Sequence, residues 1–117
     1  MNDIAQSSAI TGKTVRFAWK DGPTKGKTYE HVFHRDGTVE WHDADKQESR
    51  KGGNGTDAER VKFADEKISD GVRLVSYLSK SGYTLTVVLN YESGRITGIA
   101  SNDKTLMPVH GSFKVVE

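Results

Sequence analysis

Short runs of alternating apolar and polar residues, separated by tight glycine-containing turns, recur along the whole chain. Turns such as "RDG", "SDG", "KSG" and "ESG" have the length that joins the two strands of a β-hairpin. Parallel pairing would instead need crossovers of about a dozen residues or more. The sequence therefore predicts an antiparallel meander of eight strands, in the runs 14–20, 27–34, 38–42, 60–64, 72–79, 83–91, 95–101 and 110–116.

A meander of eight strands leaves two unpaired edges unless the sheet closes on itself. We therefore expect an all-β fold, an eight-stranded antiparallel up-and-down barrel, formed by residues 1–117 as a single domain. At most a short helical turn is expected before the first strand, in "SSAITG". The polar loop 43–58 is too long for a hairpin turn, and we expect it to be flexible and inert, since no aromatic residue in it could close on a ligand.

Charge and composition exclude several classes of partner. Seventeen Lys and Arg against sixteen Asp and Glu give a net charge of +1, with no basic run that would neutralise a row of phosphates, so we expect no nucleic-acid partner. The absence of cysteine excludes thiolate and disulfide chemistry. No signal peptide or apolar run of about 18 residues is present, which favours a cytoplasmic protein without membrane contact. We expect no cofactor and no metal.

The hairpin "FHRDGTVEW" indicates which side chains enter the barrel. A two-residue turn at Asp36 and Gly37 would mix polar and apolar side chains on both faces. A three-residue loop that begins at Arg35, with Gly37 in the left-handed region, separates them. This register directs one histidine and four apolar residues inward: Tyr29, His31, Phe33, Val39 and Trp41.

The same reasoning assigns inward positions on the other strands. The first strand sends Val15, Phe17 and Trp19 inward. A three-residue "KSG" loop directs the next hairpin so that these residues point inward: Val75, Tyr77, Ser79, Tyr83, Leu85, Val87 and Leu89, with Arg73 entering at the far end. A two-residue "KSG" turn would instead bury Leu74 and Leu78. Inward Ile96, Gly98 and Ala100 avoid burying Arg95, and we interpret the two small residues as room for one small ligand.

The stretches "GKTVRFAWKDGPTKGKTYEHVFHRDGTVEW" and "VSYLSKSGYTLTVVLNYESGRITGIASNDK", about half of the chain, resemble the MoaF-like family. The resemblance implies a calycin, or lipocalin-like, barrel with a central pocket. A more distant similarity is to bacterial phenolic acid decarboxylases, whose catalytic tyrosines and glutamate would fall here at Phe17, Trp19 and Ser79, and whose arginine would fall at Arg60 or Arg50. Phe17 and Trp19 have no phenol hydroxyl and Ser79 has no carboxyl group, so decarboxylation by that family's mechanism is disfavoured.

Three functions remain open from the sequence. The first is a barrel that binds a small hydrophobic or aromatic molecule. The second is an enzyme that acts on a small aromatic or carboxylate compound with His31 as general acid or base. The third is a homodimeric interaction protein that pairs through Val72, Leu74, Leu78 and Val88 on the outer surface. The first reading predicts a pocket lined by Phe17, Trp19, Tyr29, His31, Phe33, Trp41, Arg73, Tyr77 and Tyr83.

Overall fold

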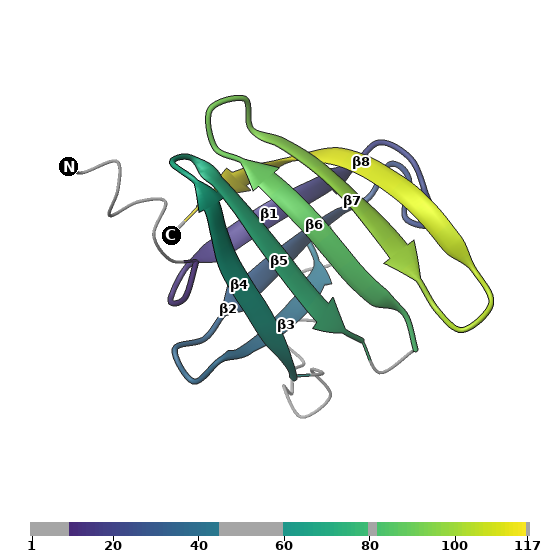
Figure 1. Ribbon diagram of the computed structural model, residues 1–117, viewed down its shortest axis with the longest axis horizontal. Coiled ribbons are helices and arrows are strands. Elements are labelled where there is room, and N and C mark those ends of the chain that lie inside the picture. Colours follow the sequence, from purple (N-terminus) through teal and green to yellow (C-terminus); the bar gives the residue numbers. More distant parts are fainter. Residues whose placement is uncertain (1–9, 45–59, 80–81, 117) are drawn as a thin grey trace.

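The computed structural model describes residues 10–44, 60–79 and 82–116. Eight strands form one closed barrel in chain order, each antiparallel to the next, and the last strand pairs with the first (Figure 1). The predicted antiparallel up-and-down barrel is therefore confirmed. The strands are β1 (Thr14–Trp19), β2 (Thr28–Phe33), β3 (Thr38–Asp43), β4 (Val61–Ser69), β5 (Val72–Leu78), β6 (Thr84–Asn90), β7 (Arg95–Ser101) and β8 (Leu106–Val115).

Two strands are longer than the sequence pattern indicated. The fourth continues from the expected "RVKFA" to Ser69, and the eighth begins at Leu106 rather than His110. Both extensions contain residues that interrupt the alternation of polar and apolar side chains, a charged run in β4 and Pro108 in β8. No helix of the described residues is long and apolar enough to cross a membrane. The expected helical turn, residues 7–12, lies half outside the described residues, and residues 10–12 are not helical. Residues 45–58 of the polar loop also lie outside them.

The β2–β3 hairpin has the three-residue loop that the sequence predicts. The His34 amide donates to the Thr38 carbonyl at 2.8 Å, and Gly37 has a φ of 90°. The left-handed conformation at this position favours glycine because it has no Cβ. His31 therefore lies opposite Trp41 and points into the barrel.

The β5–β6 hairpin also adopts the predicted register. The Ser79 amide donates to the Tyr83 carbonyl at 2.8 Å, which leaves a three-residue connection, and Tyr77 lies opposite Leu85. Tyr77 is 7% exposed, whereas the neighbouring Leu78 is 59% exposed and points outward. The alternative two-residue turn is thus excluded.

The inward glycine on β7 does not leave a void. A Cβ at Gly98 would lie 2.3 Å from the Thr86 carbonyl oxygen and 2.8 Å from a Val87 methyl group. The backbone of β6 therefore occupies the position where a side chain would be, as happens where a small barrel bends sharply. The interpretation of Gly98 as room for a ligand was wrong, although Ile96 and Ala100 are buried as predicted.

The two ends of the barrel differ in how completely they are filled. At the end formed by the β2–β3, β4–β5 and β6–β7 turns, here called the filled end, Ile10, Val15, Phe33 and Val39 are completely buried. The opposite end, here called the exposed end, carries the connections β1–β2, β5–β6 and β7–β8 (Figure 1). Six partly buried apolar side chains lie at this end or beside the neighbouring β3–β4 pairing: Tyr29, Trp41, Val61, Phe63, Tyr83 and Leu85.

The pairing between β3 and β4 is the shortest in the described barrel. Only Thr38 with Lys62 and Val39 with Val61 are paired, whereas every other neighbouring pair of strands shares at least five pairs. Within the described residues, β3 beyond Val39 therefore has a partner strand on one side only. The inward face of that segment carries Trp41, next to the interior histidine.

Candidate functional site

A cluster of stacked rings surrounds His31 in the interior. The His31 ring stacks on Phe17 with 4.1 Å between ring centroids, and it lies 5.9 Å from Trp41 in a stacked arrangement. Trp41 in turn stacks on Tyr77 at 4.8 Å. Four strands, β1, β2, β3 and β5, therefore contribute one ring each to a single cluster, which joins the filled core to the exposed end.

One polar contact anchors this cluster. Nε2 of His31 and the hydroxyl oxygen of Tyr77 are 2.8 Å apart and form a buried hydrogen bond. Nδ1 of the same ring is buried and has no hydrogen-bond partner among the described residues. Buried polar atoms are almost always hydrogen-bonded, and an unpaired one costs about 1–3 kcal/mol. Among the described residues, Nδ1 is thus the one buried side-chain nitrogen or oxygen atom that lacks a hydrogen-bond partner.

Burial fixes the charge of both partners. Desolvation lowers the pKa of His31 to about 3, even though the Tyr29 carbonyl, which does not have hydrogen-bond geometry with Nδ1, acts in the opposite direction. Desolvation also raises the pKa of the Tyr77 hydroxyl well above its ordinary value. At neutral pH the pair is therefore uncharged. If Tyr77 donates to Nε2, Nδ1 carries the proton and is a donor; in the other tautomer Nδ1 is an acceptor.

The inner wall of the exposed end is aromatic, and charged residues surround it. Tyr29, Trp41 and Tyr83 are only partly buried there. The strand pattern directs Asp43 inward at the same end, where its carboxylate lies 3.7 Å from the half-exposed Lys27 ammonium group. The β1–β2 and β7–β8 connections add further charges around this end, among them Lys25 and Lys104.

Arg73 lies apart from the ring cluster, near the filled end. Its guanidinium Nε donates to Asp65 at 2.7 Å, and both side chains are almost fully buried. The other Asp65 carboxylate oxygen accepts a hydrogen bond from the Ile10 amide at 3.3 Å. The structure therefore pairs Arg73 with a carboxylate of its own chain, and does not bring it to the other predicted pocket residues.

The remaining predicted pocket residues lie at the edges of the cluster. Trp19 packs edge-on against Phe17 with 5.9 Å between centroids and is 7% exposed. Phe33 is completely buried toward the filled end, in edge contact with Phe63. The structure thus brings Phe17, His31, Trp41 and Tyr77 together, with Trp19 and Phe33 beside them and Tyr29 and Tyr83 at the exposed end.

The outward histidines of the β2–β3 hairpin belong to ion pairs on the surface. His34 contacts Glu40, which also pairs with Arg60, and His42 lies 3.3 Å from Glu30. Among the described residues no group of three or more His, Cys, Asp or Glu side chains could hold a metal ion.

The sequence reasoning missed several contributors to the interior, among them Val109 and the following three. Ile10 fills one end of the barrel, Phe63 packs against Phe33, and Asp65 neutralises Arg73. Alternation along "VKFAD" places Phe63 and Asp65 on the same face. An inward arginine needs an inward acid, so this pattern could have identified Asp65.

Comparison with known proteins defines the class of the fold. No family model matches the chain, and no curated protein matches it in sequence. A crystal structure of a "putative beta-lactamase" from Burkholderia vietnamiensis is similar, with a TM-score of 0.68 and 13% sequence identity over 92% of this chain and 95% of the other. At this identity the likeness shows the fold alone, a closed eight-stranded barrel.

Proposed function

We propose that the barrel binds a small, uncharged aromatic molecule at its exposed end, against the ring cluster of Trp41, Tyr77 and His31. The observation that carries the proposal is the unpaired Nδ1 of a buried histidine within a stack of aromatic rings. Ligand sites are typically apolar with a few placed polar groups that fix orientation. A ligand with one hydrogen-bonding group would satisfy Nδ1 while its ring extends the aromatic stack.

The charges of the site favour a neutral ligand over an anion. His31 is uncharged at neutral pH, and the inward arginine is already paired with Asp65. At the exposed end Asp43 and Lys27 are already paired with each other, so the inner wall, as far as the structure describes it, offers a carboxylate no unpaired cation. A carboxylate-bearing compound would thus lose hydration without gaining a cationic partner.

The same pKa favours binding over proton transfer. A general base works best when its pKa lies near the working pH. A histidine with a pKa of about 3 is a weak proton acceptor at neutral pH. Without a second observation that favours catalysis, the pair His31–Tyr77 is best interpreted as an anchor for a ligand.

Membership of the MoaF-like calycins is part of this proposal, supported by the barrel order and by the inward positions of the two resembling stretches. The proposal also includes a cytoplasmic location for the protein. The name of the Burkholderia vietnamiensis neighbour suggests no site here, because a likeness at 13% identity does not extend to active-site residues.

Two probes with the same rings separate the charge requirement from simple hydrophobicity. We expect isothermal titration calorimetry at pH 7 to detect 2-naphthol, which is neutral, and to detect 2-naphthoate at least tenfold more weakly. Native mass spectrometry of the purified protein should reveal any ligand that is retained from the cell. Binding of neither probe together with no retained mass would overturn the proposal, and tighter binding of 2-naphthoate would overturn its charge argument.

A matched pair of variants tests the role of Nδ1. His31→Phe keeps a planar ring but removes the hydrogen-bonding atom, and we expect 2-naphthol affinity to fall about tenfold, which corresponds to roughly 1.4 kcal/mol. His42→Phe makes the same change at an outward position and should leave affinity unchanged. Equal affinity for all three proteins would contradict the assignment of His31 as the anchor.

A further inference from the structure

The outer face of strands β5 to β8 is almost free of charge. The strand registers align its outward side chains in four rows across the sheet. The four rows contain sixteen residues. At the chain's average of 28% charged residues, about four or five of these sixteen would be charged, but Arg95 is the only Lys, Arg, Asp or Glu among them. The rows are Val72, Asn90, Arg95, Ser112; Leu74, Val88, Thr97, His110; Ser76, Thr86, Ile99, Pro108; and Leu78, Thr84, Ser101, Leu106.

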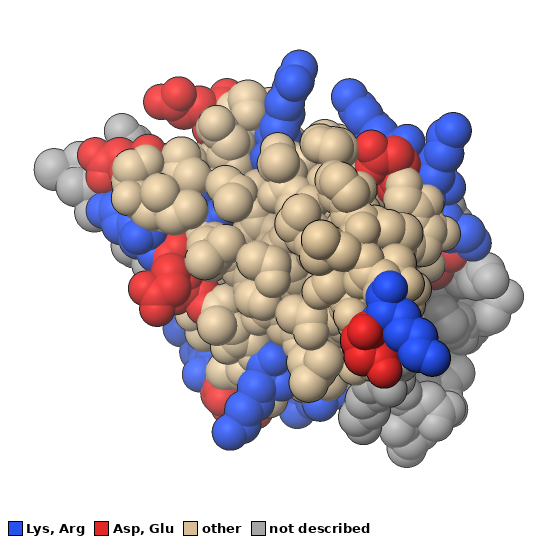
Figure 2. Space-filling model, turned by 45° about the vertical axis from the view of Figure 1, so that its right-hand side comes forward, with Lys and Arg blue, Asp and Glu red and all other residues tan. Residues whose placement is uncertain are grey.

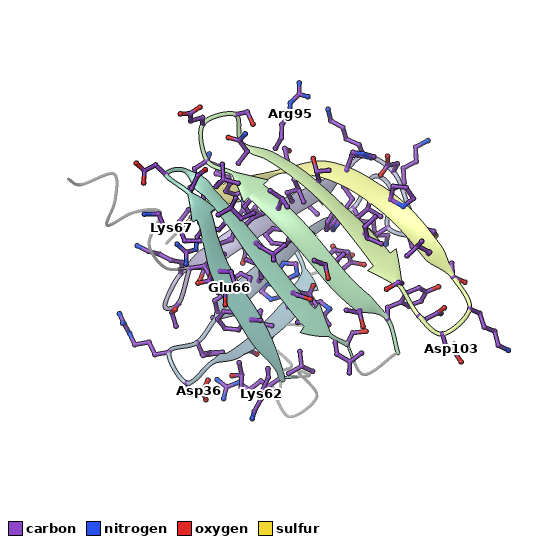
Figure 3. The ribbon with its side chains drawn as sticks, in the orientation of Figure 1. Asp36, Lys62, Glu66, Lys67, Arg95 and Asp103 are labelled. Carbon is purple, nitrogen blue, oxygen red and sulfur yellow. The ribbon has the colours of Figure 1, made fainter. Side chains whose placement is uncertain are left out.

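The other half of the barrel has the opposite character. The outward residues of β1 to β4 include five charged ones, several of them in ion pairs: Arg16, Glu30, Glu40, Lys62 and Glu66. Figure 2 turns β7 and β8 toward the viewer, and a broad area with no Lys, Arg, Asp or Glu fills its centre. In Figure 3, Arg95 and Asp103 project at opposite ends of the β7–β8 region. Charge therefore borders the β5–β8 outer face: on the β8 side Asp21 pairs with His110 at 2.9 Å, and Lys114 follows Ser112 outward on the same strand.

Exposed apolar side chains and internally paired hydroxyls cover this face. Leu78, Ile99 and Leu106 are 59%, 38% and 73% exposed, and they account for three of the five exposed large hydrophobic residues among those described. Between them, the Ser76 and Thr86 hydroxyls hydrogen-bond each other at 2.8 Å. Because these hydroxyls have a partner within the chain, covering them costs less than covering unpaired polar groups.

We propose that the β5–β8 outer face binds the same face of a second copy of this chain, as a two-fold homodimer. A two-fold interface places one patch against itself, and an uncharged patch does so without repulsion between like charges. The face gives a charged partner no opposite charge to recognise, apart from Arg95 at its corner.

The size of the face also fits a second copy. Strands β5, β6 and β7 have seven residues each, and β8 pairs with β7 over the seven residues Leu106–Ser112. With about 4.8 Å between strands and a rise of about 3.3 Å per residue, this area spans about 19 by 23 Å in projection. Protruding side chains make the accessible area of this face larger than its projected area, and bring it toward the roughly 800 Å² that each partner buries in a standard interface. Two such sheets pack face to face about 10 Å apart. The proposal does not depend on the ligand site, since the lumen and this face use opposite sides of the strands.

Sedimentation velocity over a concentration series tests the dimer. We expect the wild-type mass to rise from 12.9 kDa toward twice that value between about 1 and 200 µM. Ile99→Lys would place two cations near the two-fold axis and should weaken dimerisation at least tenfold. Leu106→Lys, at a position that is 73% exposed and therefore tolerant of substitution, should do the same without loss of folding.

Val32→Lys is the matched control. Val32 points outward on β2, opposite Glu40, so the variant adds the same charge on the other half of the barrel and should not change dimerisation. A monomer at every concentration would overturn the proposal, even if the protein bound a vesicle or another protein through this face. A dimer that is unaffected by both Ile99→Lys and Leu106→Lys, or weakened equally by Val32→Lys, would also overturn it.

Discussion

Acidification should destabilise the barrel through one buried side chain, His31. The folded state holds this ring in its neutral form with a pKa of about 3, whereas an unfolded histidine titrates near its ordinary value of 6.5. Below pH 6.5 the unfolded chain therefore binds a proton that the folded chain does not. The unfolded state is favoured as the pH falls, and the stability that the neutral histidine contributes is present only above pH 6.5.

The magnitude follows from the difference between the two pKa values. One pKa unit corresponds to 1.36 kcal/mol, so His31 alone should lower the free energy of unfolding by roughly 1 kcal/mol at pH 5.5 and roughly 3 kcal/mol at pH 4.5, relative to pH 7.5. Because pH 4.5 lies well above the folded pKa, the second value changes little if that pKa is higher by a unit.

Urea denaturation of the wild type and His31→Phe at pH 7.5, 5.5 and 4.5 measures this effect. Carboxylates and outward histidines titrate in both proteins, so their contributions cancel in the difference between the two pH profiles. We expect the wild type to lose roughly 3 kcal/mol more than the variant between pH 7.5 and 4.5. Parallel profiles would show that His31 is protonated in the folded barrel and would refute the burial argument.

Two further substitutions test the packing of the barrel. Gly98→Ala should cost several kcal/mol in urea denaturation, because its Cβ would lie 2.3 Å from the Thr86 carbonyl oxygen; a cost below about 1 kcal/mol would contradict that contact. Asp65→Ala should cost about 3–5 kcal/mol, since it leaves the Arg73 charge buried. The double variant with Arg73→Met should cost less than the two single changes together, and simple additivity would show that the ion pair is not coupled.

The strand pairings were predictable where local chemistry permits only one register. Gly37 fixes the β2–β3 loop because few other residues adopt its backbone conformation, and this register in turn places His31 inside. In β1 the alternation of apolar and polar residues identifies which side chains point into the barrel. These features depend on neighbours in sequence, so a single chain suffices to read them.

The parts that were not predictable depend on contacts between distant residues. Gly98 looks like empty space in a one-dimensional pattern, but the backbone of β6 fills it. Arg73 was assigned to the pocket from its own strand, β5, and its pairing with Asp65 becomes visible only when the alternation of β4 is considered beside it. The hydrogen bond between His31 and Tyr77 joins residues 46 positions apart in the sequence, and only the closed barrel brings them together.

The sequence of β6 connects the two proposals. In β2 and β3 the outward positions carry Glu30, Glu40 and His42, the pattern of strands with one face in water. In β6, "TLTVVLN", the outward positions hold threonines, Val88 and Asn90, so neither face carries a charge. A face without charged side chains can be covered at a lower desolvation cost than a charged one. The barrel interior covers one face of β6, and a second copy of the chain would cover the other.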